Sequence, residues 1–87
     1  MNIEFDQSKS ARNRHKHGID FATARWIFQD PDLLVVPART VDEERWIGIG
    51  RLGGHVWTAV FTLRAESIRV ISVRRARASE VQLYEGA

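Results

Sequence analysis

The first part of the chain holds a polar segment followed by an apolar one. Residues 7–17 (QSKSARNRHKH) carry almost no apolar side chain. Asp6 stands where the N-cap of a helix is expected, and Gly18 can adopt the left-handed conformation that ends one. The pattern therefore predicts a mostly polar first helix over residues 7–17.

The next segment, residues 21–28 (FATARWIF), is apolar at helical spacing. Phe21, Ala24 and Phe28 share one side of a helix, and Trp26 and Ile27 widen the apolar stripe. An aspartate before the segment and an Asp-Pro pair after it supply the expected cap and stop. The sequence thus predicts a second helix that faces the core.

From residue 33 onward the apolar positions form short runs and alternations typical of strands. LLVV, ended by Pro37, is expected at a sheet edge because proline cannot donate to a neighbouring strand. Further strands are predicted over residues 45–51, 55–64 and 67–75, and a short helix capped by Ser79 over residues 79–86. The expected fold is α+β, with two N-terminal helices packed on a mainly antiparallel sheet of about four strands.

The last two predicted strands form a hairpin if Ala65 and Glu66 are its turn. Leu63 then lies opposite Ile68, Phe61 opposite Val70, and Ala59 opposite Ser72. The apolar face would hold Trp57, Ala59, Phe61, Leu63, Ile68 and Val70, with Arg74 at its margin. The opposite face would hold Thr58, Thr62, Arg64, Arg69 and Arg75, an open cationic surface. A turn one residue longer would exchange the two faces.

Length and composition narrow the class of protein. The 87 residues predict a single domain over residues 1–87, and the absence of cysteine excludes disulfides and thiol chemistry. No apolar run approaches the ~20 residues of a membrane span. The N-terminal MNIEFDQSK is acidic where a secretory signal is basic, so we expect a cytoplasmic protein with no membrane partner.

The net charge of +2 conceals an uneven distribution of charged residues. Basic against acidic residues number 5 to 3 over residues 1–29, 1 to 5 over residues 30–44, and 7 to 3 over residues 45–87. Of the 13 basic residues 11 are arginine, which suits bidentate phosphate contacts but is also favoured by GC-rich genomes. The distribution favours a nucleic-acid partner, with an acidic belt between two basic segments.

The stretch RNRHKHG, residues 12–18, has two interpretations. Cations in the last helical turn stabilise a helix through its dipole, by about 0.3–1 kcal/mol. The same cations could hold phosphate, with the imidazole of His17 as an acid-base candidate. No metal or cofactor is expected, because His15 and His17 point to different sides of a helix and no phosphate-binding glycine motif opens one.

Seven short motifs follow one another along the chain: Phe5, Asp6 and Lys9; KHGIDF; IFQDP; EERWIGIG; TLR; RVISVRRA; and Glu80 with Tyr84. In their order and spacing they resemble the BrnT family of ribonuclease toxins. The resemblance implies a RelE-like fold and metal-independent RNA cleavage that inhibits translation. It also implies neutralisation by a BrnA-type antitoxin with a ribbon-helix-helix domain, binding of promoter DNA through the antitoxin complex, and a dimer of toxin-antitoxin pairs as one expected assembly.

Metal-free RNA cleavage needs proton transfer and cations around the phosphate. The candidate catalytic residues are Lys16, His17, Glu44, Arg64 and Arg74. The candidate RNA-binding residues are Arg12, Arg45, Arg69, Arg75 and Tyr84. Arg64 and Arg74 fall at opposite ends of their hairpin, which argues against one shared phosphate site, and Glu44 with Arg45 could equally form a structural ion pair.

Two functions of other classes remain open from the sequence. One is a nucleic-acid-binding module without catalysis, and the other is a protein-interaction module that uses the acidic belt. The toxin and the nucleic-acid-binding module should both bind nucleic acid with an affinity that falls as salt rises, and only the toxin should produce cleavage products.

Overall fold

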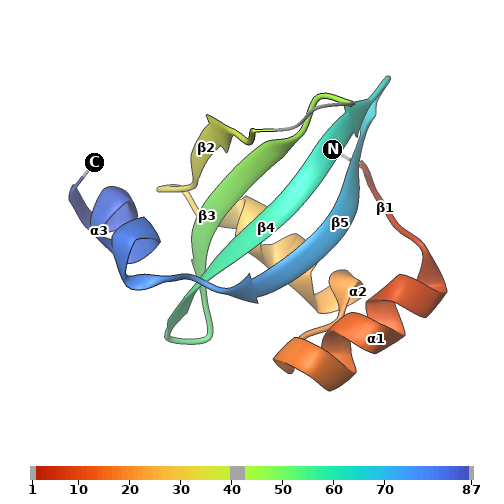
Figure 1. Cartoon of the computed structure of the whole chain (residues 1–87), viewed down its shortest axis with the longest axis horizontal. Helices are drawn as coiled ribbons and strands as arrows, with labels where there is room; N and C mark the ends of the chain where they lie inside the picture. The colour runs from red at the N-terminus through yellow and green to blue at the C-terminus, as the bar shows by residue number, and fades with distance from the viewer. Residues whose placement is uncertain (1, 40–42, 87) are drawn as a thin grey trace.

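The fold consists of one mixed sheet with helices on both of its faces (Figure 1). The computed structural model describes residues 2–39 and 43–86. The elements are β1 (Asn2–Glu4), α1 (Gln7–His17), α2 (Phe21–Ala24), η1 (Arg25–Gln29), β2 (Leu34–Pro37), β3 (Trp46–Leu52), β4 (His55–Arg64), β5 (Ser67–Arg75) and α3 (Ala78–Gly86). The strand order is β1-β5-β4-β3-β2, with only the β1 pairing parallel.

The α+β class is confirmed, whereas the expected sheet of about four strands is wrong because it has five. The missed strand, β1, is three residues long and pairs Ile3 with Ile68. Such a short strand shows no alternation, so the sequence alone gives little sign of it. Among the described residues, no helix is both long and apolar enough to cross a membrane.

The polar first helix is confirmed at both ends. Asp6 accepts a hydrogen bond from the Lys9 backbone nitrogen at 3.0 Å. Gly18 has a φ of 80°, and its N–H donates to the Arg14 carbonyl at 2.9 Å. The left-handed residue and the N-cap thus fix α1 as the sequence predicts.

The second helix begins at Phe21 as predicted, but it changes to a 3₁₀ helix at Arg25. Phe21, Ala24 and Ile27 are fully buried. This spacing of three follows the three residues per turn of a 3₁₀ helix. Trp26 therefore points away from the core and is 51% exposed, so its expected place in the apolar stripe is wrong.

The hairpin of β4 and β5 contains a bulge that the sequence does not reveal. Phe61 pairs with Val70 as predicted, but Val60 pairs with Ser72, so Ile71 has no partner on β4. Ala59 consequently lies opposite Val73, and the expected Ala59–Ser72 pair is wrong. The side chain of Val73 is completely buried on the face of the sheet that α2 and η1 cover. The extra residue thus exchanges the faces of every side chain that follows it.

The bulge places two arginines, Arg74 and Arg75, on the faces of the sheet opposite to those predicted. Arg74 lies beside Thr58 on the face away from the core, not at the margin of the apolar side. Arg75 lies opposite Trp57, and its guanidinium carbon is 5.6 Å from the centroid of the Trp57 ring. Arg75 therefore lies on the same face of the sheet as Trp57 and α2, and its expected place on the open face is wrong.

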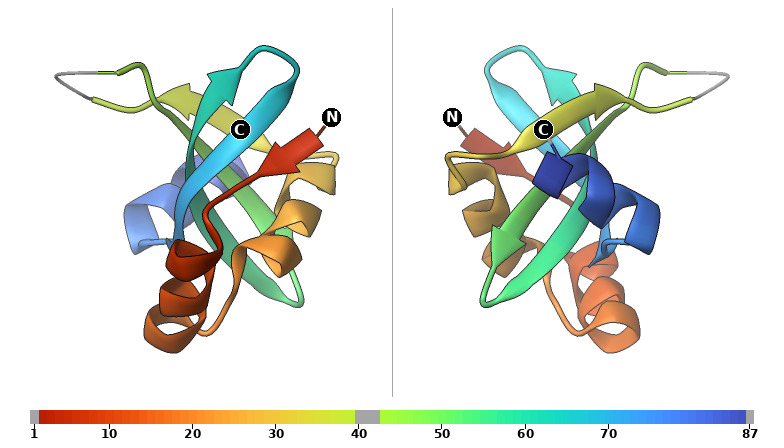
Figure 2. Two further views of the ribbon diagram at one scale, coloured as in Figure 1. Left: turned by 90° about the vertical axis from the view of Figure 1, so that its right-hand side faces the viewer. Right: turned by 90° about the vertical axis from the view of Figure 1, so that its left-hand side faces the viewer.

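The helix α3 covers part of the sheet face opposite α2 and η1 (Figure 2). Thr58 is fully buried there, and its hydroxyl donates to Glu80 of α3 at 3.1 Å. Thr62 is buried as well and donates to the Glu44 carbonyl at 2.9 Å. The expected open cationic face is therefore wrong along most of the hairpin.

The start of α3 also differs from the expectation of a Ser79 cap. The carboxylate of Glu80 accepts the Arg77 N–H at 2.8 Å, while the Arg77 carbonyl accepts the Glu80 N–H at 2.9 Å. Ser79 lies inside the helix. Glu80 makes the carboxylate half of a capping box, which satisfies a backbone donor at the helix start.

Candidate functional site

Three cations and two further polar side chains of α1 gather over the bulge of β5. Lys9, Arg12 and Lys16 recur at helical spacings of three and four and so share one side of α1. A hollow of about 290 Å³ is lined by Lys9, Arg12, Asn13, Lys16, His17, Phe21, Ile71 and Ser72. We call this hollow the cationic groove. Three predicted site residues, Arg12, Lys16 and His17, meet in it.

Asn13 fixes α1 against β5 and thereby fixes the groove. Its Nδ2 donates to the Val73 carbonyl at 2.9 Å and to the Ile19 carbonyl at 2.8 Å. Its Oδ1 accepts the Val73 N–H at 3.2 Å. The amide replaces the missing neighbour strand at this point of β5, because β1 pairs only as far as Arg69. A buried amide with such partners holds a polar helix that has little apolar surface of its own.

Ser10 completes this attachment from one turn earlier. Its hydroxyl accepts the Phe21 N–H at 2.9 Å, and the side chain is buried. The backbone at the start of α2 is therefore tied to α1. Lys16 and His17 project from a helix end whose position is fixed on two sides.

The cations of the groove differ from the arginines of the hairpin in whether they form ion pairs. Arg64 pairs with Glu43 at 3.6 Å and Arg69 with Glu4 at 3.5 Å. Within residues 2–39 and 43–86, neither Arg12 nor Lys16 forms an ion pair. The positive charge of the groove is consequently available to a ligand, whereas that of Arg64 and Arg69 is partly neutralised.

Arg74 is held by a partly buried carboxylate. Its two terminal nitrogens donate to the two oxygens of Glu80, at 2.7 and 2.9 Å. The side chains are 23% and 14% exposed. The hydrogen bond to Glu80 raises the pKa of Arg74, and the bond from Arg74 lowers the pKa of Glu80 to about 2 despite its burial. This bidentate pair anchors α3 to the sheet.

The remaining hairpin candidates do not line the groove. Arg74 pairs with Thr58 in the ladder and Arg64 with Ser67, so the two arginines are separated by about 20 Å along β4. Glu44 and Arg45 are exposed at the Arg64 end of the sheet. The structure therefore brings Arg12, Lys16 and His17 together and leaves Glu44, Arg45, Arg64 and Arg69 as a separate group.

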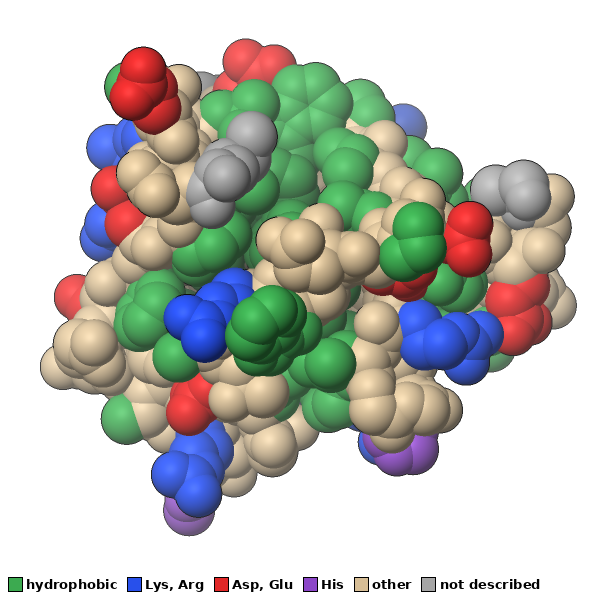
Figure 3. Space-filling model, turned by 180° about the vertical axis from the view of Figure 1, so that it is seen from behind, with side chains coloured by type: hydrophobic (Ala, Val, Ile, Leu, Met, Phe, Trp, Pro, Cys, Tyr) green, Lys and Arg blue, Asp and Glu red, His purple; other side chains and the backbone are tan. Residues whose placement is uncertain are grey.

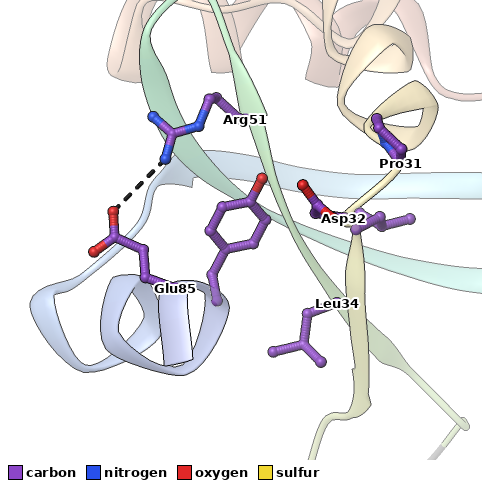
Figure 4. Close-up of a pocket in the computed structure, with 7 residues that line it drawn as sticks. Pro31, Asp32, Leu34, Arg51 and Glu85 are labelled. Atoms are coloured by element: carbon purple, nitrogen blue, oxygen red, sulfur yellow. Dashed lines mark ion pairs between the residues drawn. The ribbon is translucent and has the colours of Figure 1, made fainter. Parts of the chain in front are cut away.

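Tyr84 belongs to a third cluster, between α3 and the start of β2 (Figure 4). A hollow of about 630 Å³ there is lined by Pro31, Asp32, Leu33, Leu34, Arg51, Tyr84 and Glu85. The Tyr84 hydroxyl donates to Asp30, which raises the pKa of Tyr84. The ring is buried, and the Arg51 guanidinium carbon lies 5.7 Å from its centroid.

Asp30 is the hub of that cluster. It accepts the Arg51 N–H at 2.7 Å and the Asp32 N–H at 2.9 Å in addition to the Tyr84 hydroxyl. Burial raises the pKa of Asp30, but these hydrogen bonds outweigh it and leave the pKa lowered. Asp30, one residue of the acidic belt, thus forms hydrogen bonds within the protein. Another residue of the belt, Asp42, lies outside the described residues.

Lys9 and Asn13 are the α1 residues of the groove that were not among the predicted site residues. The helical spacing of Lys9 with Arg12 and Lys16 was a readable signal. Asn13 gave none, because its partner Val73 is 60 residues away.

The model of one protein family matches residues 5–80, and its description is ribonuclease toxin, BrnT, of type II toxin-antitoxin system. The chain belongs to the BrnT family. As a BrnT toxin it is a ribonuclease toxin with RNA as substrate and an antitoxin as partner. The matched range includes the cationic groove and Glu80 and ends before Tyr84. No curated protein sequence matches the chain.

Proposed function

We propose that this BrnT toxin cleaves RNA without a metal ion, at a phosphate bound in the cationic groove. The observation that carries the proposal is the fixed gathering of Lys9, Arg12, Lys16 and His17 around one hollow. Cations on a docked helix stabilise charge without rearranging, and such preorganised charge is a large part of catalytic power.

In the proposed reaction the 2′-oxygen of a ribose attacks the adjacent phosphorus. The bond from phosphorus to the 5′-oxygen breaks, which leaves a cyclic phosphate and a free 5′-hydroxyl. A general base takes the proton of the 2′-hydroxyl, and a general acid gives a proton to the leaving 5′-oxygen. His17 is assigned one of these two transfers because it lines the groove and imidazole is the most frequent acid-base group of enzymes. Arg12 and Lys16 hold the phosphate as its negative charge grows.

The proposal draws its positive charge from the chain itself. In the described part of the chain, no three His, Cys, Asp or Glu side chains are grouped as metal ligands. The catalytic roles expected of Glu44, Arg64 and Arg74 are not retained in this proposal. The first two lie at the far end of the sheet, and Arg74 acts through Glu80 as a positioning residue for α3.

The test is the fate of a labelled RNA incubated with purified toxin in excess EDTA. His17→Ala should slow cleavage by roughly 100-fold. His15→Ala is the matched control, since His15 is exposed and does not line the groove, and it should cleave at the wild-type rate. Products ending in cyclic phosphate support the mechanism.

Three results would count against it. Equal rates for the two histidine variants would remove His17 from the mechanism. Loss of activity in EDTA, restored by a divalent ion, would overturn metal independence. Bound but intact RNA would favour a nucleic-acid-binding module.

The second part of the proposal concerns assembly. We infer that the toxin adopts a RelE-like fold and acts in the cytoplasm. There it is neutralised by a BrnA-type ribbon-helix-helix antitoxin, binds promoter DNA only through that antitoxin, and forms a dimer of toxin-antitoxin pairs. Family membership in a type II system supports a protein antitoxin. A gel-shift assay with the promoter fragment should show binding by the complex and none by the toxin alone.

A further inference from the structure

An apolar surface lies on the face of the molecule shown in Figure 3, apart from the cationic groove. Leu63 is 54% exposed there, Trp26 51% and Val35 45%. Large apolar side chains at such exposure, gathered on one face, are typical of a surface that another protein covers.

Two adjoining hollows make this surface concave. One, of about 360 Å³, is lined only by apolar residues: Phe28, Leu33, Val35, Trp46, Phe61, Leu63 and Ile68. The other, of about 250 Å³, is lined by Ile3, Arg25, Trp26, Phe28, Gln29 and Ile68. Since Phe28 and Ile68 line both hollows, the two hollows adjoin, and we call them together the apolar groove.

The apolar groove has a cation at one end. The guanidinium carbon of Arg25 lies 4.7 Å from the centroid of the Trp26 ring, and the side chain is exposed. Arg25 forms no ion pair within residues 2–39 and 43–86, and no acidic residue lines either hollow. A ligand that fits this groove therefore combines apolar side chains with a negative charge.

We propose that the apolar groove is the docking site of a segment of the antitoxin that carries apolar side chains and a carboxylate. The segment is an amphipathic one whose apolar side chains fill the space over Phe28, Phe61 and Ile68. Its carboxylate pairs with Arg25. The proposal deepens the assignment of the chain as a type II toxin and rests on the existence of its antitoxin.

Other occupants fit the groove less well. RNA would bring phosphates to a surface whose larger hollow has no polar lining. A second copy of the chain would place this patch against itself about a two-fold axis, and Arg25 would then meet no carboxylate among the groove's lining residues. The charge at the Arg25 end thus favours a partner with acidic residues over self-association.

The groove also lies away from the cationic groove, since the two share no lining residue. Docking here and contact with RNA can therefore be altered separately. A substitution in the apolar groove should weaken the antitoxin complex and leave cleavage of RNA by the free toxin unchanged.

The test compares two exposed leucines in the full-length toxin. Leu63→Glu places a charge in the apolar groove, whereas Leu83→Glu places the same charge on α3, where Leu83 is 57% exposed. The probe is the purified antitoxin of the same toxin-antitoxin system, titrated by calorimetry. We expect Leu63→Glu to raise the Kd by roughly 30-fold, the size typical of a central interface contact, and Leu83→Glu to leave it unchanged.

A second pair of variants tests the charge. Arg25→Glu should weaken the complex, and Arg77→Glu, at an exposed position just before α3, should not. Because all four positions are exposed, circular dichroism should show folded proteins, and the rate of RNA cleavage should stay at the wild-type value.

The outcomes separate this proposal from the proposed function. Unchanged Kd values for Leu63→Glu and Arg25→Glu, or an equal loss in Leu83→Glu, would overturn the docking site. A toxin that dimerises through Leu63 in sedimentation experiments, with antitoxin binding unaffected, would overturn it in favour of self-association. Failure of the wild-type toxin to cleave RNA would count against the proposed function alone.

Discussion

At the residue scale, Glu80 attaches α3 to the face of the sheet opposite α2 and η1. It accepts from both terminal nitrogens of Arg74, from the Arg77 N–H and from the Thr58 hydroxyl. The hydrogen bond from Arg74 is the largest cause of its lowered pKa. A carboxylate with four such bonds is stabilised as the anion, so protonation should weaken the fold.

This gives a prediction with a defined sign. The folded pKa of Glu80, about 2, lies below its ordinary value of 4.5. Its contribution to the free energy of unfolding is therefore fully present above pH 4.5 and is lost as the pH falls toward 2. Glu80→Gln should reduce stability by roughly 2–3 kcal/mol at pH 7 in urea unfolding.

The difference between wild type and Glu80→Gln should shrink steadily as the pH approaches 2. Glu85→Gln is the control, because Glu85 is 60% exposed and pairs with Arg51 at 3.6 Å, and it should change little at any pH. If the wild-type and Glu80→Gln curves run parallel from neutral to acid pH, the Arg74–Glu80 pair is not the cause of the acid sensitivity.

At the element scale, two glycines of β3 leave room for their neighbours, and Gly50 allows the close approach of η1. A Cβ on Gly50 would lie 2.9 Å from both the carbonyl oxygen and Cγ2 of Ile27. A Cβ on Gly48 would meet the Phe61 ring at 3.3 Å. The first contact involves backbone and the second a side-chain tip, so only the second can relax easily.

We therefore expect Gly50→Ala to lose about 2–3 kcal/mol of stability and Gly48→Ala about 1 kcal/mol or less. Urea unfolding of the two variants measures the difference. Equal losses would mean that η1 can move away from β3 without penalty, contrary to the complete burial of Ile27.

The sequence predicts those elements whose signals are local. The first helix, its Asp6 and Gly18 ends, and the hairpin turn all depend on residues within a few positions of each other. The bulge at Ile71 does not. The edge of β5 beyond the bulge is held by Asn13, whose amide bonds the Val73 backbone from 60 residues away. No local pattern reports that contact.

The candidate site divides in the same way. Arg12, Lys16 and His17 share one helix, and helical spacing alone brings the first two to one side. Arg74 and Arg75 depend on the bulge, so their predicted faces were exchanged. Residues beyond such a register shift cannot be assigned to a face from alternation.

At the scale of the whole molecule, the pairing of the charged residues matters more than the net charge of +2. Ion pairs with Glu43, Glu4, Glu80 and Glu85 engage arginines of β3, β4 and β5. Among the described residues, the cations of the groove on α1 form no such ion pair, and only Asp6 interacts at longer range with Lys9 and Arg12. The long-range attraction of RNA should therefore be directed to the α1 side.

Salt dependence of RNA affinity tests this distribution directly. Each cation that neutralises a phosphate steepens the slope of log K against log salt by about 0.7 for a single strand. Lys9→Gln and Lys16→Gln should each reduce the slope by about this amount. Arg64→Gln should leave it nearly unchanged, because Arg64 is already paired with Glu43. A 2′-O-methyl oligonucleotide is the suitable ligand, since it lacks the attacking hydroxyl and stays intact. If Arg64→Gln instead lowers the slope as much as the lysine variants do, the bound strand crosses the hairpin end of the sheet, and the cationic groove holds only part of the site.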